Sequence, residues 1–391
     1  MRQTLTCVGA ITRQRWATGL PSSPSIVVVR YFSSTKPTAR TARKTWRRLV
    51  RFDSPDNQDV FGDLALDPDT GKAGRDDSGR HYTAFLINGD PFDRDNYELT
   101  TTKATVIKLL SPVRSPPIIL GIGLNYAKHA AELKAHPPAQ PILFTKPGTA
   151  MQHPDGPILI PQAAAEAECD YEAELAIVIG KRCKNASVEN ALEHVAGYTC
   201  ANDVTARKWQ RDLGQWCYSK SFDTFCPLGP VLVSPRVIPY PNNLNIRLTL
   251  NDELMQSSNT RDMIHNVPHL ISFLSQGTTL HPGTVILTGT PEGVGTSRTP
   301  KLVLKHGNEI KVSIQGIGTL RNSIVYENTV DDLPGAEFTA AGVSGQAESS
   351  AESDDTSSNA PIVSVSDLTM DVDRYNAGYG RRKVGRDSGT D

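Results

Sequence analysis

The stretch EAECDYEAELAIVIGK, residues 166–181, combines the pattern of a strand with several closely spaced acids. From Tyr171 to Gly180 it is rich in β-branched and apolar residues and ends in glycine, which is typical of a strand. Side chains alternate between the two faces of a strand, so Glu172 and Glu174 share one face. Because neighbouring carboxylates repel each other, the pair indicates either a solvated strand end or a site with a compensating cation.

A third acid follows in GYTCANDVTARKWQ, residues 197–210. The run from Ala196 to Cys200 predicts a second strand, and Asp203 stands where that strand would end. Three carboxylates without a nearby Cys or His pair are the ligand set of a hard divalent ion, Mg²⁺ or Mn²⁺ before Zn²⁺. The sequence therefore predicts a metal site formed by Glu172, Glu174 and Asp203.

Length and charge limit the possible classes of protein. A chain of 391 residues is long enough for one large or two ordinary domains. Its 41 basic and 42 acidic residues give a net charge of −1, which argues against nucleic acid or an anionic membrane as partner. No apolar run approaches the length needed to span a bilayer. The six cysteines include no C-x-x-C pair, so we expect free thiols.

The two ends of the chain have biased compositions. No acidic residue precedes Asp53, and this first stretch is rich in Arg and Ser, as in a mitochondrial transit peptide; the alternative is a disordered basic arm. The end of the chain is rich in Ser, Ala, Gly and Asp, which predicts disorder. We therefore expect a matrix protein divided into a transit peptide (1–32), a small β-rich unit with a linker (33–112), a main domain (113–328) and a disordered tail (329–391).

Short apolar runs between turn signals predict a strand-rich α+β fold, without the regular alternation of strand and helix that a doubly wound sheet needs. The predicted strands are RLVRF, TAFLING, 118–122, 142–145, 175–179, 231–233, 246–250, 285–288 and 310–314. Apolar residues at three-to-four spacing predict helices at 188–194 and 267–275.

The stretch GIGLNYAKHAAE, residues 121–132, contains a candidate general base. His129 and Glu132 are three residues apart in a segment of good helix propensity, so they share a face and can hydrogen-bond. A His oriented by a carboxylate is a competent base near neutral pH. The alternative is an exposed helix with an incidental His–Glu pair.

Two further features are weaker on their own. Lys220, in YSKSFD, is either a surface lysine or a cation that stabilises an oxyanion near the metal. The loop GTPEGVG, residues 289–295, lacks the spacing of a phosphate-binding loop. It is either a plain tight turn or a turn whose amides, with the Thr290 hydroxyl, hold a carboxylate.

Taken together in this order, these motifs resemble the fumarylacetoacetate hydrolase superfamily from about Pro112 to Tyr326. The resemblance rests on GLNYAKH, LFTKP, DYEAELAIVIGK, GYTCANDVTARKWQ, KSFDTFCPLGP, LNDELMQSSNT, GTPEGVG and KHGNEIKVSIQGIG, and FDTFCPLGP and MQSSNT are similar to the mitochondrial branch that includes oxaloacetate tautomerases. It implies a mixed β-roll or sandwich, usually a homodimer.

The resemblance also implies roles for individual residues. Glu172, Glu174 and Asp203 would bind the metal, His129 and Glu132 would form a catalytic dyad, and Lys220 would face the oxyanion; Arg207, Gln210 and Thr290 match positions that contact substrate. Two departures stand out. The fourth carboxylate ligand of some members is absent ahead of His129, and Lys208 stands where many relatives have Asp.

Family members act on small 2-oxo acids through an enolate that a divalent metal stabilises. Among the reactions of the family, the resemblance favours keto–enol tautomerisation of oxaloacetate as the function of this chain. The alternatives are hydrolysis of a C–C bond in a fumarylacetoacetate-like or acylpyruvate substrate, decarboxylation of oxaloacetate, and a non-catalytic protein that binds a metabolite.

Overall fold

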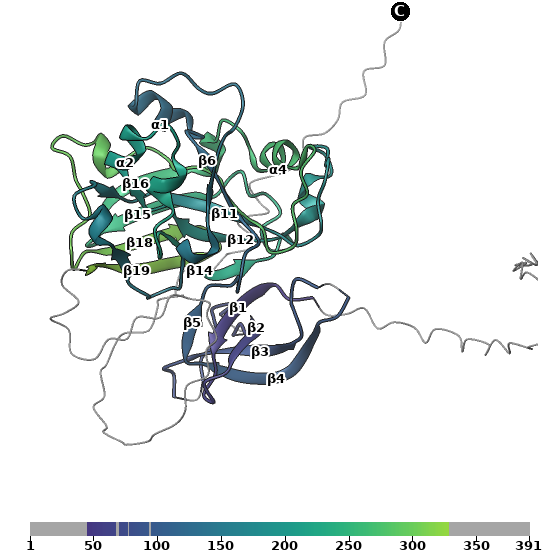
Figure 1. The fold of residues 1–391 in the computed structure, drawn as a ribbon. Helices are drawn as coiled ribbons and strands as arrows, with labels where there is room; N and C mark the ends of the chain where they lie inside the picture. Colours follow the sequence, from purple (N-terminus) through teal and green to yellow (C-terminus); the bar gives the residue numbers. More distant parts are fainter. Residues whose placement is uncertain (1–44, 68–69, 77, 94, 328–391) are drawn as a thin grey trace, which may run out of the picture. The chain divides into compact units, whose positions relative to one another are not determined.

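The computed structural model describes residues 45–67, 70–76, 78–93 and 95–327 (Figure 1). The predicted transit peptide and the predicted disordered tail lie outside these residues. Nineteen strands and four α-helices form the described part, so the prediction of a strand-rich α+β fold is confirmed.

Three sheets are present in the described residues. The twelve-stranded sheet contains β1 (Arg48–Asp53), β2 (Asp59–Leu64), β3 (Tyr82–Asn88), β4 (Glu98–Val106), β5 (Lys108–Leu110), β6 (Ile119–Gly123), β7 (Ile142–Lys146), β8 (Met151–Gln152), β11 (Ala173–Ile179), β12 (Val195–Asn202), β14 (Cys226–Val233) and β17 (Val285–Leu287). The five-stranded sheet contains β9 (Ile158–Ile160), β15 (Asn245–Leu250), β16 (Glu253–Asn259), β18 (Glu309–Ile314) and β19 (Gly318–Tyr326). The two-stranded sheet pairs β10 (Cys169–Asp170) with β13 (Thr205–Ala206). The helices are α1 (Ala127–Glu132), α2 (Arg207–Asp212), α3 (Cys217–Lys220) and α4 (Val267–Ser275).

The large sheet runs in the order β4-β3-β2-β1-β14-β12-β11-β17-β6-β7, with β5 on β1 and β8 on β14. Because β1 pairs with both β2 and β14, the N-terminal strands continue the main sheet. The predicted domain boundary near residue 112 stays a prediction.

Strand β11 is buried along its whole length because both faces of the sheet are covered. Leu175 and Ile177 share a core with Leu320 of the five-stranded sheet. Ala176 and Val178 point the other way, into a second core. Full burial of a Leu or Ile side chain stabilises a fold by roughly 1.5–3 kcal/mol. Double coverage explains the continuous apolar run and gives the acids at the start of β11 a rigid base.

The predicted strands are confirmed, with ends that differ by a few residues; the strand predicted from Tyr171 begins at Ala173. Helix α4 has its predicted bounds, and the Asn266 side chain caps it by accepting from the His269 amide at 3.1 Å.

The helix predicted at 188–194 is wrong, because only a 3-10 helix, Ala191–His194, is present. The preceding chain is held instead by hydrogen bonds to the end of α4. The Asn185 amide donates to the Ser275 carbonyl at 2.8 Å, and the Ala186 amide donates to the Ser275 hydroxyl at 3.1 Å. These tertiary bonds fix the chain just before the segment in which the apolar spacing alone indicated a helix.

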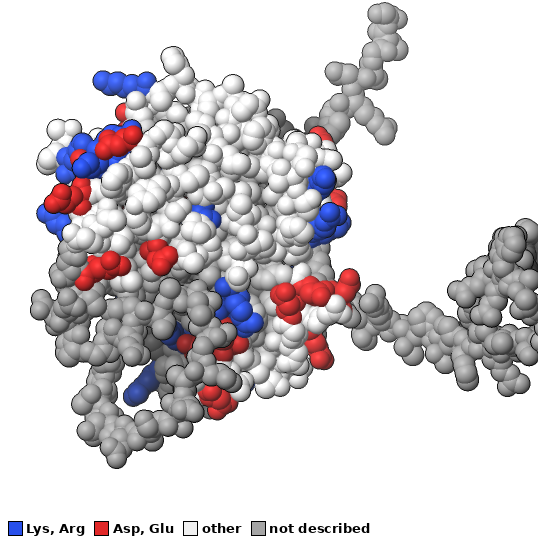
Figure 2. Space-filling view, viewed as in Figure 1, with Lys and Arg blue, Asp and Glu red and all other residues white. Residues whose placement is uncertain are grey.

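On the face drawn in Figure 2, the Lys, Arg, Asp and Glu side chains lie in small groups of both signs around a wide area without charge. Among the described residues, no helix is long and apolar enough to cross a membrane.

Acid sensitivity is expected at His153, which follows β8. Its Nδ1 accepts a hydrogen bond from the Ser111 amide at 3.1 Å. Burial, with the nearby Arg51 and Lys108 charges, lowers the pKa of His153 from 6.5 to about 4. The unfolded chain therefore takes up a proton below about pH 6.5 that the folded chain takes up only near pH 4, so stability is lost as pH falls through this window.

The measurement is chemical denaturation of the wild type and of His153→Gln, which keeps an acceptor, at pH 7 and pH 4.5. Between pH 7 and pH 4.5 the free energy of unfolding of the wild type should fall by about 1–2 kcal/mol more than that of the variant, a value that includes a discount for the partial exposure of His153. Equal losses would show that His153 does not contribute to acid sensitivity.

Candidate active site

The three carboxylates predicted to bind a metal lie together. Strands β11 and β12 pair antiparallel with Ala173 opposite Asn202, and beyond this pair the Asp203 amide donates to the Glu172 carbonyl at 2.9 Å. Glu172, Glu174 and Asp203 are buried, and each contributes a carboxylate oxygen within 4.8 Å of the others. The register of two neighbouring strands therefore brings together acids about thirty residues apart.

Lys220 is in this cluster and not on the surface, since it is only 2% exposed. It ends the short helix α3, and its Nζ donates to Glu172 Oε2 at 3.0 Å, to Thr205 Oγ1 at 2.9 Å and to Asp203 Oδ2. The Phe144 ring covers the same ammonium, with its centroid 4.5 Å from Nζ. The ammonium thus bridges two of the three carboxylates.

The charges of the cluster separate its two glutamates. Burial alone would raise the pKa of Glu172, but the Lys220 and Arg207 charges hold it at about 2. Burial, reinforced by repulsion from Asp203 and Glu172, raises the pKa of Glu174 well above its ordinary value. Burial opposes the charge of Lys220, but Asp203 and Glu172 raise its pKa, so it stays an ammonium. Among the described residues, Glu174 is therefore the acid of the cluster whose charge is compensated least.

The cluster fits a divalent cation. Within the part of the chain that the structure describes, Glu174 lies in no ion pair, and its Oε2 accepts only from the Gly289 amide, at 2.6 Å. An ion bound among the three carboxylates would supply the positive charge that Glu174 lacks. Three carboxylate oxygens suit Mg²⁺ or Mn²⁺.

The His–Glu pair on α1 is formed as predicted. His129 Nδ1 lies 2.8 Å from Glu132 Oε2, and the Gly293 amide donates to Glu132 Oε1 at 3.0 Å. Partial burial would raise the pKa of Glu132, but the hydrogen bonds from His129 and Gly293 lower it. An ionised Glu132 only accepts, so Nδ1 holds the proton and Nε2 is free to act as a base. His129 is 5% exposed, unlike a residue of an incidental surface pair.

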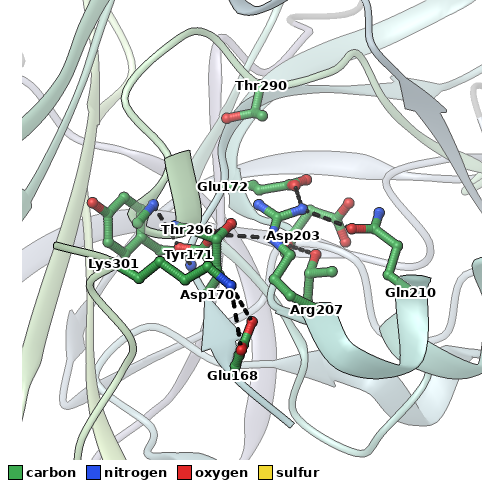
Figure 3. A network of polar contacts seen from close by, with 12 residues as sticks. Glu168, Asp170, Tyr171, Glu172, Asp203, Arg207, Gln210, Thr290, Thr296 and Lys301 are labelled. Carbon is green, nitrogen blue, oxygen red and sulfur yellow. Dashed lines mark hydrogen bonds and ion pairs between the residues drawn. The ribbon is translucent and has the colours of Figure 1, made fainter. Parts of the chain in front are cut away.

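Arg207 connects the carboxylate cluster to α2, the helix that it begins (Figure 3). Its Nη1 lies 2.6 Å from Glu172 Oε1 and donates to Gln210 Oε1 at 3.0 Å. Its Nε donates to Asp170 Oδ2 at 2.9 Å. Lys208, the departure from the family pattern, is exposed. The two predicted substrate residues of α2 are therefore in contact with each other, and Arg207 also contacts the cluster.

The Gly-rich loop that follows β17 holds carboxylates of this protein. The Gly289 amide binds Glu174, and the Gly293 amide binds Glu132. The Thr290 hydroxyl accepts from Gln256 Nε2 at 2.9 Å. The Gly289 and Gly293 amides therefore hold carboxylates of the chain itself, whereas the Thr290 hydroxyl pairs with Gln256, and the loop joins the carboxylate cluster to the His–Glu pair.

Residues 118–325 match the family described as "Fumarylacetoacetate (FAA) hydrolase C-terminal". This match covers more than half of the chain. The chain belongs to the fumarylacetoacetate hydrolase family. Members of the family include tautomerases, isomerases and hydrolases. This chain is therefore an enzyme.

Two curated relatives are named mitochondrial oxaloacetate tautomerases. One, from Xenopus laevis, is 46% identical over 221 residues, which is 56% of this chain and 69% of the relative. The other, from Bos taurus, is 44% identical over 230 residues, 58% of this chain and 73% of the relative. The solved structure of a 5-carboxymethyl-2-hydroxymuconate delta-isomerase from Mycobacterium smegmatis is 36% identical and has a TM-score of 0.60. It is matched over 72% of this chain and all of that chain.

Sequence reasoning did not assign Lys146, which ends β7 in the motif LFTKP. It is 1% exposed, and its Nζ lies 2.7 Å from Asp203 Oδ1. The same ammonium donates to the carbonyls of Lys220 at 2.7 Å and of Phe225 at 2.6 Å. Its presence in a motif of the fumarylacetoacetate hydrolase family was the available signal. Lys146 contacts one carboxylate oxygen of Asp203, and Lys220 contacts the other.

Gln256, on β16, was also missed. It is fully buried, its Oε1 accepts from the Ala173 amide at 2.9 Å, and its Nε2 donates to the Thr290 hydroxyl. Gln256 therefore connects the start of β11 to the Gly-rich loop. The motif LNDELMQSSNT contains it, but nothing in the spacing indicated which side chain turns inward.

Proposed function

We propose that this enzyme is a divalent-metal-dependent oxaloacetate keto–enol tautomerase. The observation that supports it most is the buried His129, oriented by an ionised Glu132 and joined by one loop to three buried carboxylates. A protonated His129 would help to lower the pKa of Glu172, so the base and the cluster are within electrostatic reach. The names of the two tautomerase relatives support the choice of oxaloacetate.

In this proposal Glu172, Glu174 and Asp203 hold Mg²⁺ or Mn²⁺. When bound, the ion supplies Lewis-acid stabilisation of negative charge on the oxo oxygen of the substrate. Lys220 adds a fixed positive charge beside the same carboxylates.

The chain's own groups would then move the proton. His129 Nε2 takes a proton from C3 of the keto form and delivers it to the enolate oxygen, which gives the enol, while Glu132 keeps the imidazole in the correct tautomer. Arg207 and Gln210 bind the carboxylate of the 2-oxo acid, and the Thr290 hydroxyl offers a further contact. Tautomerisation requires only this exchange, with no water as nucleophile.

The second candidate is hydrolysis of a C–C bond, for which the family is named. The same His–Glu pair would then activate a water that attacks a carbonyl, and the cleaved fragment would leave as an enolate. Decarboxylation of oxaloacetate would generate an enolate by loss of carbon dioxide. All three reactions use the same charges, and the names of the two tautomerase relatives favour tautomerisation.

The test uses pure protein with Mg²⁺ and oxaloacetate. The proposal predicts that the enol absorbance of oxaloacetate reaches its equilibrium value faster than in buffer, and that NMR shows only the two tautomers. Pyruvate formed above the metal-only background would support decarboxylation instead.

We also propose that the protein acts in the mitochondrial matrix, because its relatives are named mitochondrial and its first residues have the composition of a transit peptide. Import should remove about thirty residues, near Arg30-Tyr31-Phe32. Mass spectrometry of protein from isolated mitochondria should find Ser33, or a residue close to it, at the new N-terminus. An intact Met1 in a cytosolic fraction would contradict this. Assembly as a homodimer stays a prediction from the family.

A further inference from the structure

Asp170 is a fully buried carboxylate to which the proposed reaction gives no role. It lies on β10, two residues before Glu172. Its Oδ1 accepts from the amides of Tyr171 at 2.9 Å and Gly295 at 2.8 Å. Its Oδ2 accepts from the Thr296 amide at 3.1 Å, from the Thr296 hydroxyl at 2.9 Å and from Arg207 Nε at 2.9 Å. So many donors leave the carboxylate a single orientation.

The turn at Gly295 and Thr296, which supplies three of these donors, comes very close to Asp170. A Cβ atom on Gly295 would lie 2.6 Å from Asp170 Oδ1 and 2.2 Å from the Leu302 carbonyl oxygen. Only glycine permits this approach without displacement of the backbone. The carboxylate is therefore fixed by the backbone, independently of Arg207.

Arg207 is held on two of its three nitrogens. Nε is bound by Asp170, and Nη1 is bound by Glu172 and Gln210. Nη2 is buried and has no hydrogen-bond partner within the described residues. A buried N–H group without an acceptor is costly, so this nitrogen is suited to an acceptor brought by a ligand.

We propose that Asp170 is a positioning residue for Arg207. Because a guanidinium is planar, the bond from Nε to a carboxylate fixed by the backbone sets the plane of the group and the direction of Nη2. Asp170 thereby aims Nη2 at the carboxylate of a 2-oxo acid, an inference that rests on the proposed function for the class of substrate. The side chain itself does not touch the substrate.

A merely structural Asp170 would only stabilise the turn at Gly295 and Thr296. A double-mutant cycle separates the two roles. The probe is oxalate, a small unreactive dicarboxylate, and its Kd for the Mg²⁺-loaded protein is measured by calorimetry, with Tm recorded for each variant. The variants are Asp170→Asn, Arg207→Gln and the two combined. Thr296→Val is the matched control, because it removes a donor to the same Asp170 oxygen but leaves the contact to Arg207.

If Asp170 acts through Arg207, each single variant weakens oxalate binding about tenfold, and the double variant binds within about twofold of Arg207→Gln alone. Thr296→Val lowers Tm but leaves the Kd within about twofold. An oxalate Kd about a hundredfold weaker in the double variant, or an unchanged Kd in Asp170→Asn, would overturn this inference but leave the proposed function standing. Absence of oxalate binding by the wild type would overturn the inference and the proposed substrate class together.

If Asp170→Asn does not fold, Asp170→Glu serves as the second variant. It keeps the negative charge opposite Arg207 but moves the carboxylate by one methylene. The inference expects a similarly weaker oxalate Kd from the displaced guanidinium, with no further loss when Arg207→Gln is added. Wild-type affinity in Asp170→Glu would contradict it.

Discussion

Removal of divalent ions with excess chelator should abolish turnover, and Mg²⁺ or Mn²⁺ should restore it. Three buried carboxylates lie within 4.8 Å of one another, and Glu174 among them lies in no ion pair with a described residue. Ca²⁺ should rescue little, because its longer bonds would hold a substrate oxygen more loosely. The measurement is the initial rate with oxaloacetate before and after chelation. Full activity in excess chelator would refute the metal site.

Carboxamide variants of the same residues should weaken metal binding by about two orders of magnitude or more, measured by calorimetry. Their effects on the metal-free protein should differ. Glu172→Gln leaves Lys220 and Arg207 short of a charged acceptor, so it should lower Tm. Glu174→Gln removes a buried charge that is repelled by its neighbours, so Tm should stay the same or rise. Glu253→Gln, on the exposed part of β16, is the control and should change neither quantity.

Loss of the His–Glu pair should slow the reaction while leaving the metal in place. His129→Ala or Glu132→Gln should lower the rate of proton exchange by about two to four orders of magnitude, the usual range for a positioned acid or base. Metal affinity should be nearly unchanged, because neither side chain belongs to the carboxylate cluster. The exposed His281→Ala is the matched control. A wild-type rate in both dyad variants would assign proton transfer to another group.

The sequence predicted most of this site because its acids lie on neighbouring strands. Glu172, Glu174 and Asp203 come together through the pairing of β11 with β12, and both strands are visible as apolar runs. His129 and Glu132 are joined within one helix. Local periodicity is enough for such contacts, and the same holds for α4, whose capping residue and apolar spacing agree.

Contacts between residues that lie far apart in the sequence, on elements that do not pair, could not be predicted in this way. Asp170 binds Gly295, 125 residues later, and Lys146 at the end of β7 binds Asp203, with strands β8 to β12 between them in the sequence. No periodicity connects such residues, because their approach depends on the packing of whole sheets. The helix predicted at 188–194 is wrong for a related reason, because its apolar spacing does not show that the preceding Asn185 and Ala186 are tied to Ser275 at the end of α4.

The most direct test of the central claim follows deuterium in oxaloacetate by NMR, with Mg²⁺-loaded enzyme in deuterated water and acetylpyruvate in a parallel reaction. Proton exchange by His129 predicts that enol and keto oxaloacetate equilibrate faster than in buffer, with label at C3. Pyruvate should not exceed the metal-only background, and acetylpyruvate should stay intact. Rapid cleavage of acetylpyruvate, with oxaloacetate equilibrating no faster than in buffer, would contradict the tautomerase and establish the hydrolase in its place.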